Sequence, residues 1–211
     1  MVGDRVGDRD SAWANGVPHV HLARGYARSG EEVLCEAVID GFDELLPRLA
    51  VRDGVLDDCV QRLDLLEPSL QVLGICGPPG AGKTLLAREL SAKVQAAGRP
   101  SAVHTLDEEE RHPVIPTERQ EGLPPGGLLI VEGRWLGSRV LAPHGGRLLR
   151  VVGHEQLLLR RIEGRDGRVS GPMPVRRARE ELLPEAAAFA EEAGPFTAVL
   201  DTTNLLEPRL R

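Results

Sequence analysis

The stretch that decides the fold is an apolar run followed by a glycine-rich turn and a Lys-Thr pair. The run is Leu70-Gln71-Val72-Leu73-Gly74-Ile75-Cys76, and the turn and pair read Gly77-Pro78-Pro79-Gly80-Ala81-Gly82-Lys83-Thr84. Over residues 83–97 apolar side chains recur at helical spacing, and Gly98 is a typical helix stop. The sequence therefore predicts a buried strand, a tight loop and a helix in direct succession.

The turn fits G-x-x-x-x-G-K-[ST], the P-loop motif, at every fixed position. Its glycines let the backbone fold around a phosphate with N–H groups pointing inward, and the helix N-terminus adds its positive end. We expect Lys83 to reach the β- and γ-phosphates and Thr84 to offer its hydroxyl to Mg²⁺. A chance glycine-rich turn is the alternative. The predicted nucleotide-binding residues are Gly77, Pro78, Pro79, Gly80, Ala81, Gly82, Lys83, Thr84 and Leu85.

The charged residues of the 211-residue chain narrow the function further. There are 26 basic and 32 acidic side chains, for a net charge of −6, and the only lysines are Lys83 and Lys93. The acidic balance argues against general nucleic-acid binding, which needs a basic face. Lys93 lies between Ala92 and Val94 and cannot form the Asn-Lys-x-Asp motif that reads guanine in regulatory GTPases. ATP is therefore favoured over GTP.

The sequence also bears on the cellular compartment. No apolar run approaches the roughly 20 residues that span a bilayer, and the N-terminus lacks the apolar region of a signal peptide. Cys35, Cys59 and Cys76 are scattered without metal-ligand spacing, which predicts buried free thiols in a reducing compartment. We expect a cytoplasmic protein with no membrane partner.

Short apolar runs alternate with helical patterns after residue 70. Alternation of this kind predicts an α/β fold, a three-layer sandwich with a five-stranded parallel sheet and helices on both faces. Expected helices cover 83–97, 154–162 and 175–192, the last kinked at Pro184. The expected strands are residues 70–76, 101–106, 128–131, 147–152 and 198–201.

Residues 1–69 are predicted to be an N-terminal tail and a helical pair that precede the domain 70–211. Residues 1–28 suggest little regular structure, although Trp13 favours docking onto the chain's own domain. Ser29 has capping-box spacing to Glu32 and begins a helical pattern that we expect Gly54 to interrupt. A second, shorter helix is expected over 56–66. These helices could support a homodimer.

Three features of residues 70–211 together resemble small-molecule P-loop kinases, specifically the group of uridine kinase, phosphoribulokinase and pantothenate kinase. They are the phosphate-binding turn, an Asp at the end of the second strand (Thr105-Leu106-Asp107) and the end of the third strand (Ile130-Val131-Glu132-Gly133). The resemblance implies that Asp107 lies at the acceptor hydroxyl as base or orienting group and near the metal. It implies that Glu132, with Thr84, holds Mg²⁺. Asp107 as a helix cap or solvated acid is the alternative.

The resemblance also implies a lid that closes over the ATP phosphates. Glycines and arginines alternate between residues 160 and 179, where this family places its lid. Arginine grips phosphate oxygens with its planar fork, and we expect Arg161 and Arg165 to act in catalysis and Arg168 to bind the nucleotide. Ordinary solvated surface charges are the alternative.

The segment after Asp107 is shorter than the acceptor-binding insertion of uridine kinase-like proteins. The sequence therefore leaves the identity of the acceptor open. The candidate residues for contacting it are Arg111, His112, Arg134 and Trp135. The first hypothesis is a kinase that uses ATP and Mg²⁺ to phosphorylate a hydroxyl of a small metabolite or nucleoside-like molecule. The second is a nucleotide-dependent switch or accessory ATPase acting on a protein partner. The third is a nucleotide-binding module without turnover.

Overall fold

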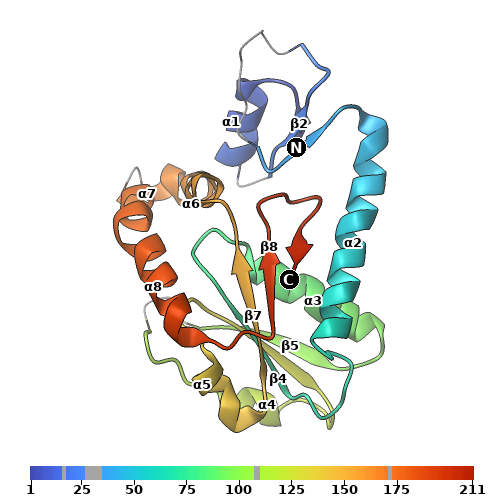
Figure 1. Cartoon of the computed structure of the whole chain (residues 1–211), viewed down its shortest axis with the longest axis vertical. Coiled ribbons are helices and arrows are strands. Elements are labelled where there is room, and N and C mark those ends of the chain that lie inside the picture. Colours follow the sequence, from blue (N-terminus) through green and yellow to red (C-terminus); the bar gives the residue numbers. More distant parts are fainter. Residues whose placement is uncertain (16–17, 27–34, 107–109, 171–172) are drawn as a thin grey trace.

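The computed structural model describes residues 1–15, 18–26, 35–106, 110–170 and 173–211. A six-stranded sheet of order β5-β6-β4-β7-β8-β9 lies at its centre (Figure 1). Five strands are parallel: β4 (Val72–Cys76), β5 (Ser101–Thr105), β6 (Leu128–Glu132), β7 (Arg147–Val152) and β8 (Ala198–Asp201). They lie where the sequence predicts them. The expected total of five strands is wrong, because β9 (Arg209–Leu210) adds an antiparallel edge to β8.

The central strand β4 is buried on both faces of the sheet. Leu73 and Ile75 belong to one apolar cluster, which α2 (Leu45–Arg62) and α3 (Lys83–Ala96) cover. Val72 and Cys76 belong to a second cluster on the opposite face, near α5 (Ser138–Leu141). Alternation of side chains along a strand produces this division and explains why β4 is a continuous apolar run.

The helical region after β7 differs from the prediction in its boundaries. The helix α6 (Glu155–Ser170) continues through most of the expected lid segment instead of ending near Ile162. It is followed by α7 (Met173–Arg177), a π-helical turn η3 (Ala178–Leu182) and α8 (Leu183–Ala193). The π-turn ends two residues before Pro184, which has no backbone N–H for a regular helical bond. A short helix α4 (Thr117–Glu121) lies between β5 and β6, where the sequence predicts no helix.

The predicted helical pair in residues 1–69 is wrong. One continuous helix, α2, runs through Gly54, where a Cβ would meet open space. A helix interior tolerates glycine at a cost of about 1 kcal/mol, and packing of Leu56, Cys59 and Val60 into the core offsets that cost. The expected start at Ser29 lies outside the described residues. Within the expected first helix, residues 37–39 instead form a strand.

The described part of the first 44 residues contains a helix and short strands, whereas the sequence predicts little regular structure over residues 1–28. We call the described residues among the first 44 the N-terminal unit. It contains α1 (Val6–Ala14), a 3₁₀ turn η1 (Phe42–Glu44) and a three-stranded parallel sheet. The strands are β1 (Val2–Gly3), β2 (Val20–Leu22) and β3 (Ala37–Ile39).

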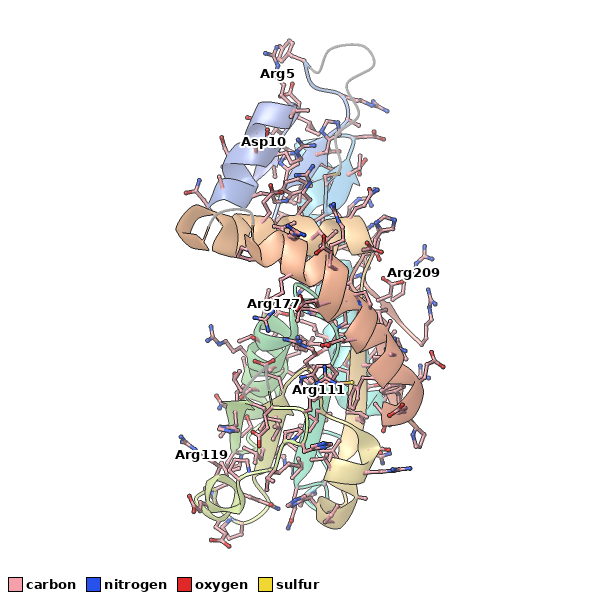
Figure 2. All side chains as sticks on the ribbon, turned by 90° about the vertical axis from the view of Figure 1, so that its left-hand side faces the viewer. Arg5, Asp10, Arg111, Arg119, Arg177 and Arg209 are labelled. Atoms are coloured by element: carbon pink, nitrogen blue, oxygen red, sulfur yellow. The ribbon has the colours of Figure 1, made fainter. Side chains whose placement is uncertain are left out.

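The N-terminal unit packs on one end of the molecule, against α6 and the segment after β8 (Figure 1). Leu206 completes its apolar cluster of Val20, Ala37 and Ile39. Trp13 is buried, with the guanidinium groups of Arg9 and Arg160 at 4.9 and 5.9 Å from its ring. The expected docking of Trp13 onto its own chain is confirmed. In Figure 2, Arg5 and Asp10 are labelled in the N-terminal unit, and Arg119 is labelled near the opposite end of the molecule.

The cysteines are free, as the sequence predicts. Cys59 and Cys76 are buried, and burial raises the pKa of each thiol to about 12. Cys35 is half-buried, and burial raises its pKa as well. In the described parts of the chain no helix is long and apolar enough to cross a membrane.

A buried arginine joins three connections at the amino-terminal edge of the sheet. Arg99 donates to the carbonyl oxygens of Leu65, Leu70 and Gly126, the last at 2.8 Å, and to that of Gly127 at 3.4 Å. Burial lowers the pKa of Arg99. A planar guanidinium can reach these carbonyls together, whereas a lysine ammonium cannot.

We predict that Arg99→Lys lowers the free energy of unfolding by about 3 kcal/mol, because buried carbonyl groups lose their donors. Denaturant unfolding followed by circular dichroism measures this change. Arg88→Lys is the control: Arg88 is exposed on α3 and its replacement should change stability by less than about 0.5 kcal/mol. Equal stability of the two variants would show that the Arg99 contacts contribute little.

Candidate functional site

The turn after β4, which we call the phosphate loop (residues 77–82), follows a path that only glycine can take at two points. Gly77 has φ +150°, and a Cβ there would lie 2.2 Å from the Val151 carbonyl oxygen. Gly80 has φ +78°, and its Cβ would lie 2.6 Å from the Leu158 carbonyl oxygen. The loop is therefore pressed against the backbone of β7 and α6. It lies at the carboxyl end of β4, where successive crossovers go to opposite sides and ligands bind in doubly wound sheets.

The phosphate loop leads directly into α3. Gly82 is the N-cap residue with φ +87°, and no side chain caps this helix end. Lys83 is largely buried, and its Nζ donates to the Pro78 carbonyl oxygen at 3.1 Å, so that the ammonium folds back over the loop. An uncapped helix start beside a lysine ammonium is a favourable place for an anion.

The structure places Thr84 and Glu132, the two residues that the resemblance assigns to magnesium, in contact with each other. Thr84 Oγ1 donates to Glu132 Oε1 at 2.8 Å, and Thr105 Oγ1 donates to the same oxygen at 2.8 Å. Glu132 is buried, and its register partner across β5 and β6 is Thr105. A carboxylate and two hydroxyls are the hard oxygen donors that Mg²⁺ prefers. These residues fit a magnesium ion that takes its other ligands from water and nucleotide phosphates.

The described residues contain no group of three or more His, Cys, Asp or Glu side chains able to hold a metal alone. A single carboxylate with a hydroxyl is the set expected when phosphates and water supply the remaining ligands. Asp107, the other predicted metal and catalytic residue, lies outside the described residues. The side chains of Arg165 and Arg168 are likewise outside the described part of the chain.

Of the three arginines expected at the nucleotide (Arg161, Arg165 and Arg168), Arg161 is the one whose side chain the structure describes. It donates to the carbonyl oxygens of Gly80 at 3.4 Å and Thr202 at 3.1 Å. Its Nε lies 3.5 Å from Glu36 Oε1. Burial lowers the pKa of Arg161, and Glu36 partly opposes that effect. The guanidinium thus links the phosphate loop, the end of β8 and the N-terminal unit.

A cavity of about 470 Å³ opens above the phosphate loop. We call it the phosphate-loop cavity. Its floor includes Gly80, Lys83 and Thr84, and its walls come from α2, α6, the segment after β8 and the N-terminal unit. Polar and charged wall residues are Glu36, Arg52, Arg160, Arg161 and Thr202, and apolar ones are Trp13, Pro18, Leu56, Leu85, Leu200, Leu205 and Pro208.

A second cavity of about 550 Å³ lies near the carboxyl ends of β5 and β6, and we call it the Trp135 cavity. Three of the four predicted acceptor contacts, Arg111, His112 and Trp135, line it. Phe189 meets Trp135 edge to face with 5.3 Å between ring centroids, and Arg111 pairs with Glu185 at 2.5 Å. Figure 2 shows Arg111 in the half of the molecule that holds the sheet, below Arg177 of α7.

The fourth predicted acceptor contact, Arg134, is buried and is not among the residues lining the Trp135 cavity. Its guanidinium lies 5.2 Å from the Trp135 ring centroid, as does that of Arg111. A cation beside an indole ring is attracted to its electron-rich face. Arg134 therefore contacts the ring that forms the cavity wall.

Sequence reasoning missed several residues of these two cavities. Thr105 had a signal, because it ends a predicted strand beside the strand of Glu132. Trp13 was expected to dock onto the chain's own domain, but nothing in the sequence placed it at this cavity. Glu36 had no signal, because its place there depends on how the N-terminal unit packs. Glu185 and Phe189 lie on α8, far along the chain from Trp135, and only tertiary packing brings them to it.

Comparison with known proteins finds similarity among solved structures. No family model matches the chain, and no curated protein matches it. Among solved structures, the chain is similar to a protein from Silicibacter sp. TM1040 named "putative fructose transport system kinase". The sequences are 21% identical, the TM-score is 0.49, and the match covers 72% of this chain and 98% of the other.

We predict that Gly80→Ala weakens nucleotide binding at least about tenfold, because a Cβ collides with the Leu158 carbonyl and the residue must hold a positive φ. Calorimetric titration with ATP and Mg²⁺ measures the dissociation constant. Gly54→Ala is the control, since it adds the same methyl group to open space on α2. Unchanged affinity in Gly80→Ala would mean that the loop path seen here is not needed for binding.

Proposed function

We propose that this protein is a Mg²⁺- and ATP-dependent phosphotransferase that moves the γ-phosphoryl group of ATP to a hydroxyl of a small molecule. The observation that carries this proposal is the pair of cavities at the carboxyl ends of the parallel strands. Lys83 and Thr84 line one cavity, and Trp135 lines the other. Hydrogen bonds from Thr84 and Thr105 to Glu132 connect the two regions. They join the start of α3, beside the phosphate loop, to the end of β6, which leads to the Trp135 cavity.

The residues of the phosphate loop have the chemistry for holding a nucleotide. Backbone N–H groups at the start of α3 could donate to a bound phosphate, and Lys83 could leave the Pro78 carbonyl for a phosphate oxygen. Thr84 and Glu132 would hold Mg²⁺, which neutralises charge on the β- and γ-phosphates when bound. Phosphoryl transfer depends mainly on positioning and charge neutralisation, so these groups supply much of what the reaction needs.

The Trp135 cavity supports a small acceptor. Its volume suits a small molecule, and aromatic walls with a few charged groups are typical of ligand pockets. Arg111 and His112 follow closely after Asp107, which we expect to orient the acceptor hydroxyl. The cavity lining includes positively and negatively charged side chains that can hydrogen-bond to a ligand, so the cavity suits a polar acceptor. They are Arg111, Arg139, Glu185 and Glu192.

One observation favours the second candidate, a nucleotide-dependent switch or accessory ATPase. The N-terminal unit contributes Trp13, Pro18 and Glu36 to the wall of the phosphate-loop cavity. A unit in that place could report nucleotide binding to a protein partner. Hydrolysis of ATP at a constant rate without any acceptor would favour this function over the kinase.

We predict that ADP release from ATP depends on an acceptor in a screen of sugars, nucleosides, amino acids, vitamins and antibiotics. Lys83→Ala should reduce that release at least about a hundredfold, because the ammonium at the phosphates is lost. Lys93→Ala is a matched control, since Lys93 is the chain's other lysine and pairs with Asp53 and Asp57 on α2. Full activity in Lys83→Ala would contradict the assigned site.

We also predict that Trp135→Ala raises the KM for the acceptor about tenfold or more while the KM for ATP stays within about twofold. The indole forms a wall of the Trp135 cavity and is absent from the phosphate-loop cavity. Initial-rate kinetics with each substrate varied in turn separate the two constants. A change confined to the KM for ATP would place the acceptor elsewhere.

A further inference from the structure

Glu36 is a carboxylate in an unusual place. It comes just before β3 in the N-terminal unit, and its side chain is 1% exposed. It accepts hydrogen bonds from Trp13 Nε1 at 3.0 Å and from the His19 backbone N–H at 2.8 Å. These neutral donors fix the carboxylate in position but carry no compensating charge. Its ion-pair partner is the guanidinium of Arg161, on α6, whose Nε lies 3.5 Å from Glu36 Oε1.

Arg161 belongs to the phosphate-loop cavity as well. It reaches the Gly80 carbonyl oxygen, and both Arg161 and Glu36 line that cavity. The ion pair therefore forms part of the wall of the pocket where we expect nucleotide phosphates. A nearby anion stabilises a buried guanidinium. The Glu36 carboxylate supplies one anion, and a phosphate bound at the phosphate loop would supply another.

The two anions oppose each other. A carboxylate in the wall of a cavity for a polyanion raises the free energy of phosphate binding, because like charges repel strongly where water is scarce. The arginine that could attract the phosphates is at the same time occupied by that carboxylate. Placing Glu36 there makes nucleotide binding weaker than the same pocket would allow without it.

We propose that Glu36 and the nucleotide phosphates compete for Arg161, so that nucleotide binding and docking of the N-terminal unit oppose each other. The proposal rests on the nucleotide site of the proposed function and assigns that site a built-in regulator. When phosphates take Arg161, Glu36 loses its counter-ion and gains a repulsive neighbour. By linkage, the factor by which docking weakens nucleotide affinity equals the factor by which nucleotide weakens docking.

The N-terminal unit is held loosely enough that loss of the Glu36–Arg161 ion pair would weaken its docking. Its strands have two or three residues each, and sheets this small have little stability of their own. Besides Glu36, its attachments to the rest of the chain include the apolar contact of Leu206, the Trp13 ring beside Arg160, and a backbone hydrogen bond from Leu205 to Glu36 at 2.9 Å. Two of these attachments lie next to the competing pair. The Leu205 hydrogen bond goes to Glu36 itself, and Arg160, beside the Trp13 ring, is the sequence neighbour of Arg161.

The test compares ATP·Mg²⁺ affinity of the wild type and Glu36→Gln by calorimetric titration. We expect Glu36→Gln to bind at least about fivefold more tightly, because it removes the competing charge and keeps the side-chain shape. Glu180→Gln is the matched control: it removes the same charge from an exposed pair with Arg176 and should leave affinity unchanged. Equal or weaker binding by Glu36→Gln would overturn the proposal.

A second measurement needs no variant. Saturating ATP·Mg²⁺ should increase hydrogen–deuterium exchange in wild-type peptides that cover α1 and β3, while exchange in β4 stays unchanged or slows. Unchanged or slower exchange in α1 and β3 would overturn the proposal even if Glu36→Gln bound more tightly. If neither wild type nor Glu36→Gln binds nucleotide, the proposed function fails too. If the wild type binds and Glu36→Gln binds no tighter, only the competition fails.

Discussion

The constraint on which the site depends is the close approach of the phosphate loop to two backbone carbonyls. Gly77 lies against Val151 of β7 and Gly80 against Leu158 of α6, at distances that leave no space for a Cβ. This contact fixes where the loop turns and therefore where α3 begins. The first turn of α3, with Lys83 and Thr84, is aimed at the same edge of the sheet as Glu132 at the end of β6. Glycine at these two positions thus determines which side chains can meet a ligand.

The carboxyl ends of parallel strands lie at one edge of the sheet, and the site is formed by the side chains at those strand ends. Glu132 ends β6 and receives hydroxyl donors from Thr105 at the end of β5 and from Thr84 at the start of α3. Neutral hydroxyls satisfy the geometry of a buried carboxylate without neutralising its charge. A buried anion of this kind gains most from a bound cation, which gives the magnesium assignment a physical basis independent of any resemblance.

The sequence predicted those parts of the fold and site that local pattern determines. The five parallel strands are apolar runs bounded by turn residues, and the phosphate loop is a fixed motif, so both could be placed from residues alone. The strands β1, β2, β3 and β9 have two or three residues, too few for any periodicity, and they form only because distant partners pair with them. Gly54 suggested a helix end, but α2 continues through it, and core packing of Leu56, Cys59 and Val60 on its C-terminal side stabilises the helix. Glu36 had no sequence signal, since its meaning depends on Arg161, more than a hundred residues away.

The N-terminal unit therefore changes how the two cavities should be understood. Without it, the phosphate-loop cavity would be an open basic groove, with Arg161 and Arg160 facing solvent beside Lys83. With it, a wall of Trp13, Pro18 and Glu36 narrows the groove and brings a negative charge to the arginine. The Trp135 cavity lacks any residue of that unit. Under the proposed function, a contact that acts on one cavity alone would adjust nucleotide affinity and leave acceptor affinity unchanged, so that the two substrates would be regulated separately.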